Sequence, residues 1–241
     1  MNNIFIYGPC SIDTESNLDY IAKSIKEMGI NYLRAGAFKP RTSPYTFKGL
    51  KYAGIKILKR ISDKYNLKSV SEILDIKDIK YFAENIDIIQ LGARNMQNYT
   101  LLEELGKLKK PVIIKRGFMS TIKELLYAIE YLLQQGNEKI IICERGIRTF
   151  QKESRFSLDI TSIFAIKEKT DFPVIVDPSH STGKSGWVER ASLASIAAGA
   201  DGLMVETHRY PSMSLSDDNH IISVDELKKL HSKVMKIKEV L

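Results

Sequence analysis

Short runs of branched apolar residues recur along this chain, and each is followed by a longer amphipathic segment. Eight such runs are candidate strands, at 4–7, 31–35, 68–71, 86–91, 111–115, 139–143, 173–177 and 202–205. The helical patterns lie at 16–28, 49–65, 77–83, 98–108, 121–135, 156–168, 188–198 and 224–240. Near-continuous isoleucine and valine runs are typical of parallel strands that are covered on both faces. Eight strand–helix units therefore predict an α/β protein with a single (β/α)8 TIM barrel.

A doubly wound open sheet is the alternative that the same alternation allows. Nucleotide-binding sheets of that kind carry GxGxxG or GxxxxGK[ST] fingerprints, and the sequence has neither. The 241 residues also match the length of a bare barrel, for which about 250 residues are typical. Because no low-complexity linker or added segment of domain size is present, we expect residues 1–241 to form one catalytic domain without a separate regulatory domain. Segment 206–222 is the longest irregular stretch, and it should be a loop on the catalytic face.

Composition and charge exclude several classes of protein. No stretch approaches the ~20 apolar residues that cross a bilayer. The N-terminus lacks the basic and apolar segments of a secretory signal, so we expect a cytoplasmic protein without a membrane partner. The net charge is +7, but the lysines are scattered over helical segments and are not interleaved with aromatic residues. We therefore expect no nucleic-acid partner, although a non-catalytic anion or nucleic-acid binding protein is a distant alternative that predicts salt-dependent binding.

Polar residues follow most of the predicted strands, where barrel enzymes carry their chemistry. They are Cys10, Arg34, Glu72, Arg94, Lys115, Glu144, Arg145, Asp177, His180, Glu206, His208 and Asp217. The cations among them come from different strands, so only closure of a barrel brings them together. Guanidinium and ammonium groups in this number indicate a phosphate or carboxylate ligand.

The two cysteines occur in different contexts. Cys143 ends the apolar run IIIC and is expected in the core, whereas Cys10 follows Gly-Pro directly after the first strand. Together with His180, Glu206 and Asp217, Cys10 supplies a set of ligands that suits Mn, Fe, Co or Zn better than Ca or Mg. A buried thiol and a hydrogen-bonded histidine explain Cys10 and His180 equally well, so the pattern alone leaves the metal open.

The segment that contains His180 also has the residue types of a Ser-His-Asp triad. No GxSxG elbow is present, and an adjacent serine and histidine do not by themselves create the geometry of a nucleophile and its base. Capping of a helix N-terminus explains Ser179, Ser181 or Thr182 without any catalytic role.

Five motifs in order resemble those of the 3-deoxy-D-arabino-heptulosonate 7-phosphate (DAHP) synthases. They are Gly8-Pro9-Cys10-Ser11, Lys39-Pro40-Arg41-Thr42-Ser43-Pro44-Tyr45 with Gly49-Leu50, Gly92-Ala93-Arg94-Asn95, Asp177-Pro178-Ser179-His180-Ser181-Thr182-Gly183 and Leu215-Ser216-Asp217. The resemblance runs from about residue 4 to residue 238 and is to the compact type I enzymes. It implies a TIM barrel that condenses phosphoenolpyruvate, erythrose 4-phosphate and water, in the first step of the shikimate pathway. A homo-oligomer, either a tetramer or a dimer, is also implied.

The resemblance assigns roles to individual residues. It implies a divalent metal ion bound by Cys10, His180, Glu206 and Asp217. It implies that the phosphate of phosphoenolpyruvate is held by Arg94, next to Ala93, and by Lys115 and Arg145. Arg34 and Lys39 match residues near the carboxylate and the reacting carbons. We expect Lys39 to donate a proton to the developing alkoxide, or to stabilise it. The candidate catalytic residues are therefore Lys39 and, as implied metal ligands, Cys10 and His180.

The aldose is indicated by Arg41, Thr42 and Ser43, which match the loop that binds erythrose 4-phosphate. The octulosonate enzymes have Lys-Ala-Asn-Arg-Ser-Ser in place of Lys-Pro-Arg-Thr-Ser. The alternative activity is therefore 3-deoxy-octulosonate 8-phosphate synthase, which uses arabinose 5-phosphate. Two departures stand out: Asp218 follows Asp217 and is a substitute candidate for the fourth ligand, and 208–211 replaces the usual His-Pro segment.

Overall fold

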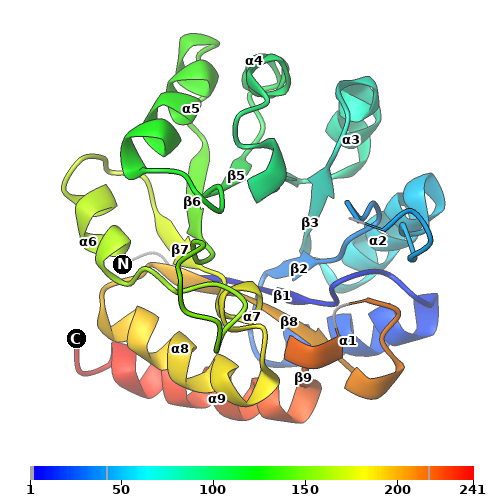
Figure 1. Ribbon diagram of the computed structural model, residues 1–241. Coiled ribbons are helices and arrows are strands. Elements are labelled where there is room, and N and C mark those ends of the chain that lie inside the picture. Colours follow the sequence, from blue (N-terminus) through cyan, green and yellow to red (C-terminus); the bar gives the residue numbers. More distant parts are fainter. Residues whose placement is uncertain (1–2, 42, 217) are drawn as a thin grey trace.

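The computed structural model describes residues 3–41, 43–216 and 218–241, and its strands form a closed parallel barrel (Figure 1). The strands are β1 (Ile4–Gly8), β2 (Tyr32–Arg34), β3 (Lys68–Ile73), β4 (Ile88–Leu91), β5 (Val112–Lys115), β6 (Ile140–Glu144), β7 (Val174–Val176) and β8 (Gly202–His208). Each pairs in parallel with the next. β1 also pairs in parallel with β8, with Ile4 opposite Gly202, and this pairing closes the sheet. The predicted (β/α)8 barrel is confirmed.

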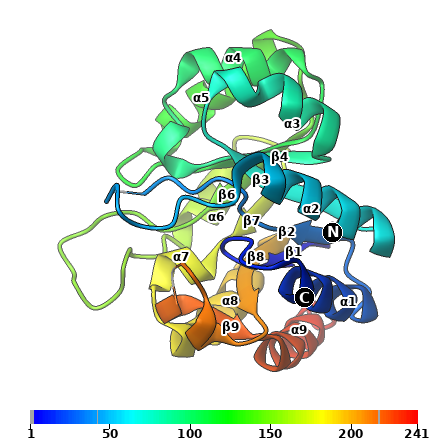
Figure 2. The same ribbon diagram turned by 90° about the vertical axis from the view of Figure 1, so that its right-hand side faces the viewer.

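Helices surround the barrel, and the connections after β2 and β6 project from the same side of it (Figure 2). The helices are α1 (Glu15–Glu27), α2 (Lys51–Tyr65), α3 (Ile79–Asn85), α4 (Tyr99–Lys107), α5 (Ile122–Gln134), α6 (Thr161–Lys167), α7 (Pro178–Thr182), α8 (Ser185–Ala197) and α9 (Val224–Lys238). α5 and α9 begin with capping boxes, in which the side chains of Thr121 with Glu124 and of Ser223 with Glu226 bond reciprocally to the backbone. None of the described helices is long and apolar enough to span a membrane.

Two predicted boundaries were wrong. α6 begins at Thr161, because Ser157 forms an isolated antiparallel bridge with Ile147 and the preceding segment is not helical. The segment 206–222 is less irregular than expected, because β8 continues to its last residue, His208. It also contains the short 3-10 turns η3 (Pro211–Met213) and η4 (Asp218–His220), before β9 (Ile222–Ser223) pairs with β8. Two further 3-10 turns, η1 (Ile76–Asp78) and η2 (Ala93–Asn95), follow β3 and β4.

Inward-facing side chains form two successive layers inside the barrel. One apolar cluster contains Ile4, Ile6, Val70, Ile88, Ile113, Cys143, Ile175 and Met204, and we call it the apolar layer. Because side chains alternate along a strand, residues two positions further point the same way. Beyond the cluster members on β3 to β8 these residues are polar and buried, and so is Arg34, two positions after Tyr32, which packs against the apolar layer. We call them the polar layer: Arg34, Glu72, Gln90, Lys115, Arg145, Asp177 and Glu206. The alternation thus carries charged groups to the carboxyl ends of the strands.

Candidate active site

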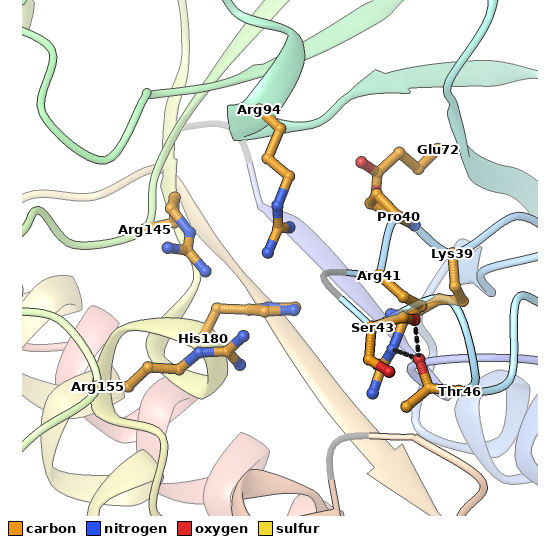
Figure 3. A pocket seen from close by; sticks show the side chains of 10 residues that line it. All are labelled: Lys39, Pro40, Arg41, Ser43, Thr46, Glu72, Arg94, Arg145, Arg155 and His180. Carbon is orange, nitrogen blue, oxygen red and sulfur yellow. Dashed lines mark hydrogen bonds between the residues drawn. The ribbon is translucent and has the colours of Figure 1, made fainter.

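A pocket of about 280 Å³ opens at the carboxyl ends of the strands (Figure 3). Its lining residues are Lys39, Pro40, Arg41, Ser43, Thr46, Glu72, Arg94, Arg145, Arg155 and His180. Half of them carry a positive charge, and Glu72 is the one carboxylate among these ten. Arg94 and Arg145 point into the pocket from one side, while Lys39 and Arg41 approach from the other (Figure 3). This distribution favours an anionic ligand that reaches across the pocket.

Three potential metal ligands meet at one side of the pocket. Cys10 follows β1, His180 lies in α7 after β7, and Glu206 lies in β8. One ligand atom of each residue lies within 4.8 Å of the others, and the thiol and the carboxylate are fully buried. A thiolate, an imidazole and a carboxylate fit a borderline divalent ion, and three protein ligands leave coordination positions for other groups.

The ring of His180 is fixed by the carboxylate of Asp177. His180 Nδ1 lies 2.7 Å from Asp177 Oδ2, and the backbone N–H of His180 donates to Asp177 Oδ1 at 2.9 Å. Gly183, with a φ of +68°, ends the short helix just beyond the histidine. Burial lowers the pKa of His180 to about 3, so the imidazole is neutral and able to bind a metal. The hydrogen bond on Nδ1 leaves Nε2 to face the cluster.

Glu206 is held by two cationic or hydrogen-bonding neighbours. Arg34 donates to its Oε1, and His220 Nε2 lies 2.9 Å from its Oε2. Burial alone would raise the pKa of Glu206, but His180 and Arg34 lower it well below the usual range. The same balance lowers the pKa of Asp177, where His180 and Lys115 outweigh burial. Both carboxylates therefore stay ionised at neutral pH.

Lys39 lies next to the thiol of Cys10. Its Nζ is 2.8 Å from Cys10 Sγ and donates to the carbonyl oxygen of Cys10 at 3.3 Å. The side chain is buried and also lines the pocket. A proton-bearing group thus lies between the potential metal ligands and the space available to a substrate.

Two of the phosphate-binding candidates, Arg94 and Arg145, lie across the pocket from Lys39 (Figure 3). Lys115 is buried and bonds to Asp177 Oδ2, while Arg94 and Arg145 line the pocket. Ala93 lies beside Arg94 in η2. Burial lowers the pKa of Arg145 to about 10, so an anion that reaches this guanidinium would offset part of its desolvation.

The loop predicted to bind the aldose contributes Arg41 and Ser43 to the pocket lining. Arg41 Nε donates to Thr46 Oγ1 at 3.2 Å, and Thr46 Oγ1 donates to the carbonyl oxygen of Ser43 at 2.9 Å. These bonds fold the loop back on itself at the mouth of the pocket. Thr42 lies outside the described residues.

The described structure does not place every predicted site residue at the pocket. Asp217 lies outside the described residues, and the structure does not describe the side chain of Asp218. His208 contacts Asp13 and Asn17, at 2.8 and 2.7 Å, instead of joining the metal candidates. The serine of the rejected triad, Ser179, accepts a hydrogen bond from the backbone N–H of Glu206.

Sequence reasoning missed three residues that contact the site. Arg155 and Thr46 line the pocket, and His220 bonds to Glu206. Arg155 and Thr46 lie in connections between strands and helices, and the course of these connections depends on tertiary contacts that the local sequence does not reveal. His220 lies in segment 206–222, three residues after the end of the Leu215-Ser216-Asp217 motif, but nothing in the spacing linked it to Glu206.

The comparisons with known proteins agree on one family. The sequence model described as the DAHP synthetase I family matches residues 2–241. The phospho-2-dehydro-3-deoxyheptonate aldolase of Thermotoga maritima is 45% identical over 236 residues, which cover 98% of this chain and 70% of that protein. The 2-dehydro-3-deoxyphosphooctonate aldolase of Desulfotalea psychrophila is 30% identical over 254 residues, which cover 98% of this chain and 89% of that protein. The crystal structure of the Thermotoga maritima DAHP synthase aligns with a TM-score of 0.97 and 44% identity, covering 99% of this chain and 70% of that one.

Proposed function

The chain belongs to the DAHP synthetase I family, and from this premise we propose that it condenses phosphoenolpyruvate with erythrose 4-phosphate and water. The products are 3-deoxy-D-arabino-heptulosonate 7-phosphate and inorganic phosphate. Carbon 3 of phosphoenolpyruvate bonds to the aldehyde carbon, water adds at carbon 2, and phosphate leaves with the bridging oxygen. The observation that carries the proposal is one pocket with five cations beside a Cys/His/Glu cluster.

We propose that Cys10, His180 and Glu206 hold a divalent ion, with Asp217 or Asp218 as the candidate fourth ligand. The mixed set of sulfur, nitrogen and oxygen ligands favours Mn, Fe, Co or Zn. When bound, such an ion supplies Lewis-acid polarisation of a carbonyl oxygen or activation of a water molecule.

The protein's own side chains bind and orient the two substrates. Arg94, Lys115 and Arg145 would bind the phosphate of phosphoenolpyruvate, and Arg34 would lie near its carboxylate. Arg41, Thr42 and Ser43 would hold the phosphate of the aldose. Lys39 would donate the proton that the aldehyde oxygen takes up, and its position 2.8 Å from Cys10 Sγ supports that role.

The proposal extends to the domain organisation, the assembly and the location of the protein. The barrel, from β1 to α9, would act as one catalytic domain. The protein would work as a homo-oligomer in the cytoplasm, an expectation that family membership supports.

Phosphate release from phosphoenolpyruvate tests the proposal directly. The enzyme is assayed with erythrose 4-phosphate or arabinose 5-phosphate, each with and without EDTA. We expect release with the four-carbon aldose, loss of release with EDTA, and recovery on addition of Mn2+. Preferential use of arabinose 5-phosphate would instead assign the octulosonate reaction, which the 30% identical relative keeps as the second candidate. Full activity after chelation would refute the metal site, and no release with either aldose would refute the enzyme.

A further inference from the structure

Two phenylalanines stack beside the phosphate side of the pocket. Phe118 lies in the β5–α5 connection and Phe156 in the β6–α6 connection. Their ring centroids are 4.9 Å apart, and the planes differ by 10°. Phe156 is buried and Phe118 is partly buried, yet neither belongs to the two apolar clusters that the described residues form. The pair is therefore packed against something other than the hydrophobic core.

Arginines surround this aromatic pair. The guanidinium carbon of Arg145 lies 4.2 Å from the ring centroid of Phe156 and 4.7 Å from that of Phe118. Arg94 lies 5.3 Å from the Phe118 centroid. Arg148 and Arg155 lie 5.9 and 5.8 Å from one ring each. All four are within the distance of about 6 Å at which a cation and an aromatic face attract each other.

An aromatic face holds a guanidinium differently from a carboxylate. Carboxylates hold Arg34 and Lys115 in the polar layer, and those ion pairs use N–H donors and neutralise charge. A ring orients the guanidinium through its face and accepts none of the in-plane N–H bonds. Consistent with this, Arg145 Nη1 is buried and has no hydrogen-bond partner among the described residues. Arg145 thus lines the pocket with a guanidinium that the two rings contact and with one donor, Nη1, unpaired among the described residues.

We propose that the Phe118–Phe156 pair positions Arg145 and Arg94 to bind the phosphate of phosphoenolpyruvate. The pair orients both cations through ring contacts, without using their donors. This inference rests on the proposed function, because it takes phosphoenolpyruvate as the anion. The two phenylalanines are positioning residues, since they act through the arginines.

Leucine substitutions test the positioning role. In Phe118→Leu/Phe156→Leu we expect the KM and the calorimetric Kd for phosphoenolpyruvate to rise about 10-fold. The kcat and the KM for erythrose 4-phosphate should change less than about twofold, as when binding common to the ground and transition states is lost. Tyr99→Leu is the matched control, because Tyr99 stacks on Tyr131 at 4.7 Å between α4 and α5. That variant loses a stacked ring of similar size, and its affinity for phosphoenolpyruvate should not change.

A series of fluorinated phenylalanines at position 156 separates the ring's electrostatics from its shape. Each added fluorine weakens the negative potential of the ring face while largely preserving its size, so the Kd should rise step by step. Phe156→Tyr, which keeps the face, should bind nearly as the native protein does. A flat fluorine series, or unchanged affinity in the double leucine variant, would overturn the inference. Because calorimetry needs no turnover, an inactive enzyme that still shows the fluorine trend would refute the proposed reaction alone.

Discussion

The barrel interior changes character between the apolar layer and the polar layer, although the same strands build both. In the apolar layer Cys143 packs among isoleucine, valine and methionine, and burial raises the pKa of its thiol to about 12. Just beyond the polar layer, the thiol of Cys10 lies beside Lys39 and within reach of His180 and Glu206. Two equally buried cysteines are thus an inert core residue in one region and a candidate metal ligand in the other.

The difference between the layers is also one of energetics. Burying apolar side chains stabilises the fold, whereas burying charges costs free energy that ion pairs at best offset. The polar layer meets this requirement with the pairs Arg34–Glu206 and Lys115–Asp177 and with a hydrogen bond from Gln90 to Glu72 at 3.2 Å. We therefore expect substitutions in the apolar layer to reduce mainly stability, and substitutions in and around the polar layer to reduce mainly activity.

Replacing each of the two cysteines with alanine should give the largest difference between loss of activity and loss of stability. Cys10→Ala removes a candidate ligand, so we expect loss of bound metal and a fall in kcat of at least about 100-fold, with little change in melting temperature. Cys143→Ala leaves a small cavity in the apolar layer, which should cost about 1 kcal/mol of stability while activity stays within twofold. Metal analysis, steady-state kinetics and thermal unfolding of both variants measure the contrast. Equal losses of activity in the two variants would contradict the division between the layers.

Asp177→Asn tests whether a residue of the polar layer influences metal binding through its contact with His180. Asp177 Oδ2 accepts from His180 Nδ1 and from Lys115, while Oδ1 accepts from the backbone N–H of His180. An amide has only one oxygen, so it cannot accept at both positions. We expect about a 10-fold loss of metal affinity, measured by titration of the metal-free protein. Asp201→Asn is the control, because Asp201 pairs with Lys167 and accepts from the backbone N–H of Val174 at the other end of the barrel. Metal affinity that falls equally in both variants would mean that Asp177 has only a structural role.

The strand pattern was enough to predict the barrel and most of the polar residues at the carboxyl ends of its strands. Parallel strands with a period of two place residues such as Arg34 and Glu206 at one end of the barrel, and no tertiary contact is needed to see this. The grouping of Cys10 with His180 needed more, because the two ligands lie at opposite ends of the sequence and no short motif joins them. The resemblance to a family favoured a shared metal site over the alternative of a buried thiol and an unrelated hydrogen-bonded histidine.

The connections were predicted least well, for a physical reason. The apolar spacing at 156–168 suggested one helix, but Phe156 stacks on Phe118 and Ser157 bonds to Ile147, so the helix starts later. Contacts between separate connections outweighed the local helical pattern there. The same holds for Arg155, whose place in the pocket lining follows from the course of that connection.

The smallest effect is expected from Ile113→Val, and it tests whether the layers are independent. Ile113 lies in the apolar layer on β5, two residues before Lys115 on the same face of the strand. Loss of one methylene should cost about 1 kcal/mol of stability, which thermal or denaturant unfolding can measure. The rigid strand should keep Lys115 in place, so the KM for phosphoenolpyruvate should stay within twofold. A larger rise in KM, at unchanged kcat, would show that packing in the apolar layer sets the position of the phosphate-binding groups and that the two layers act as one unit.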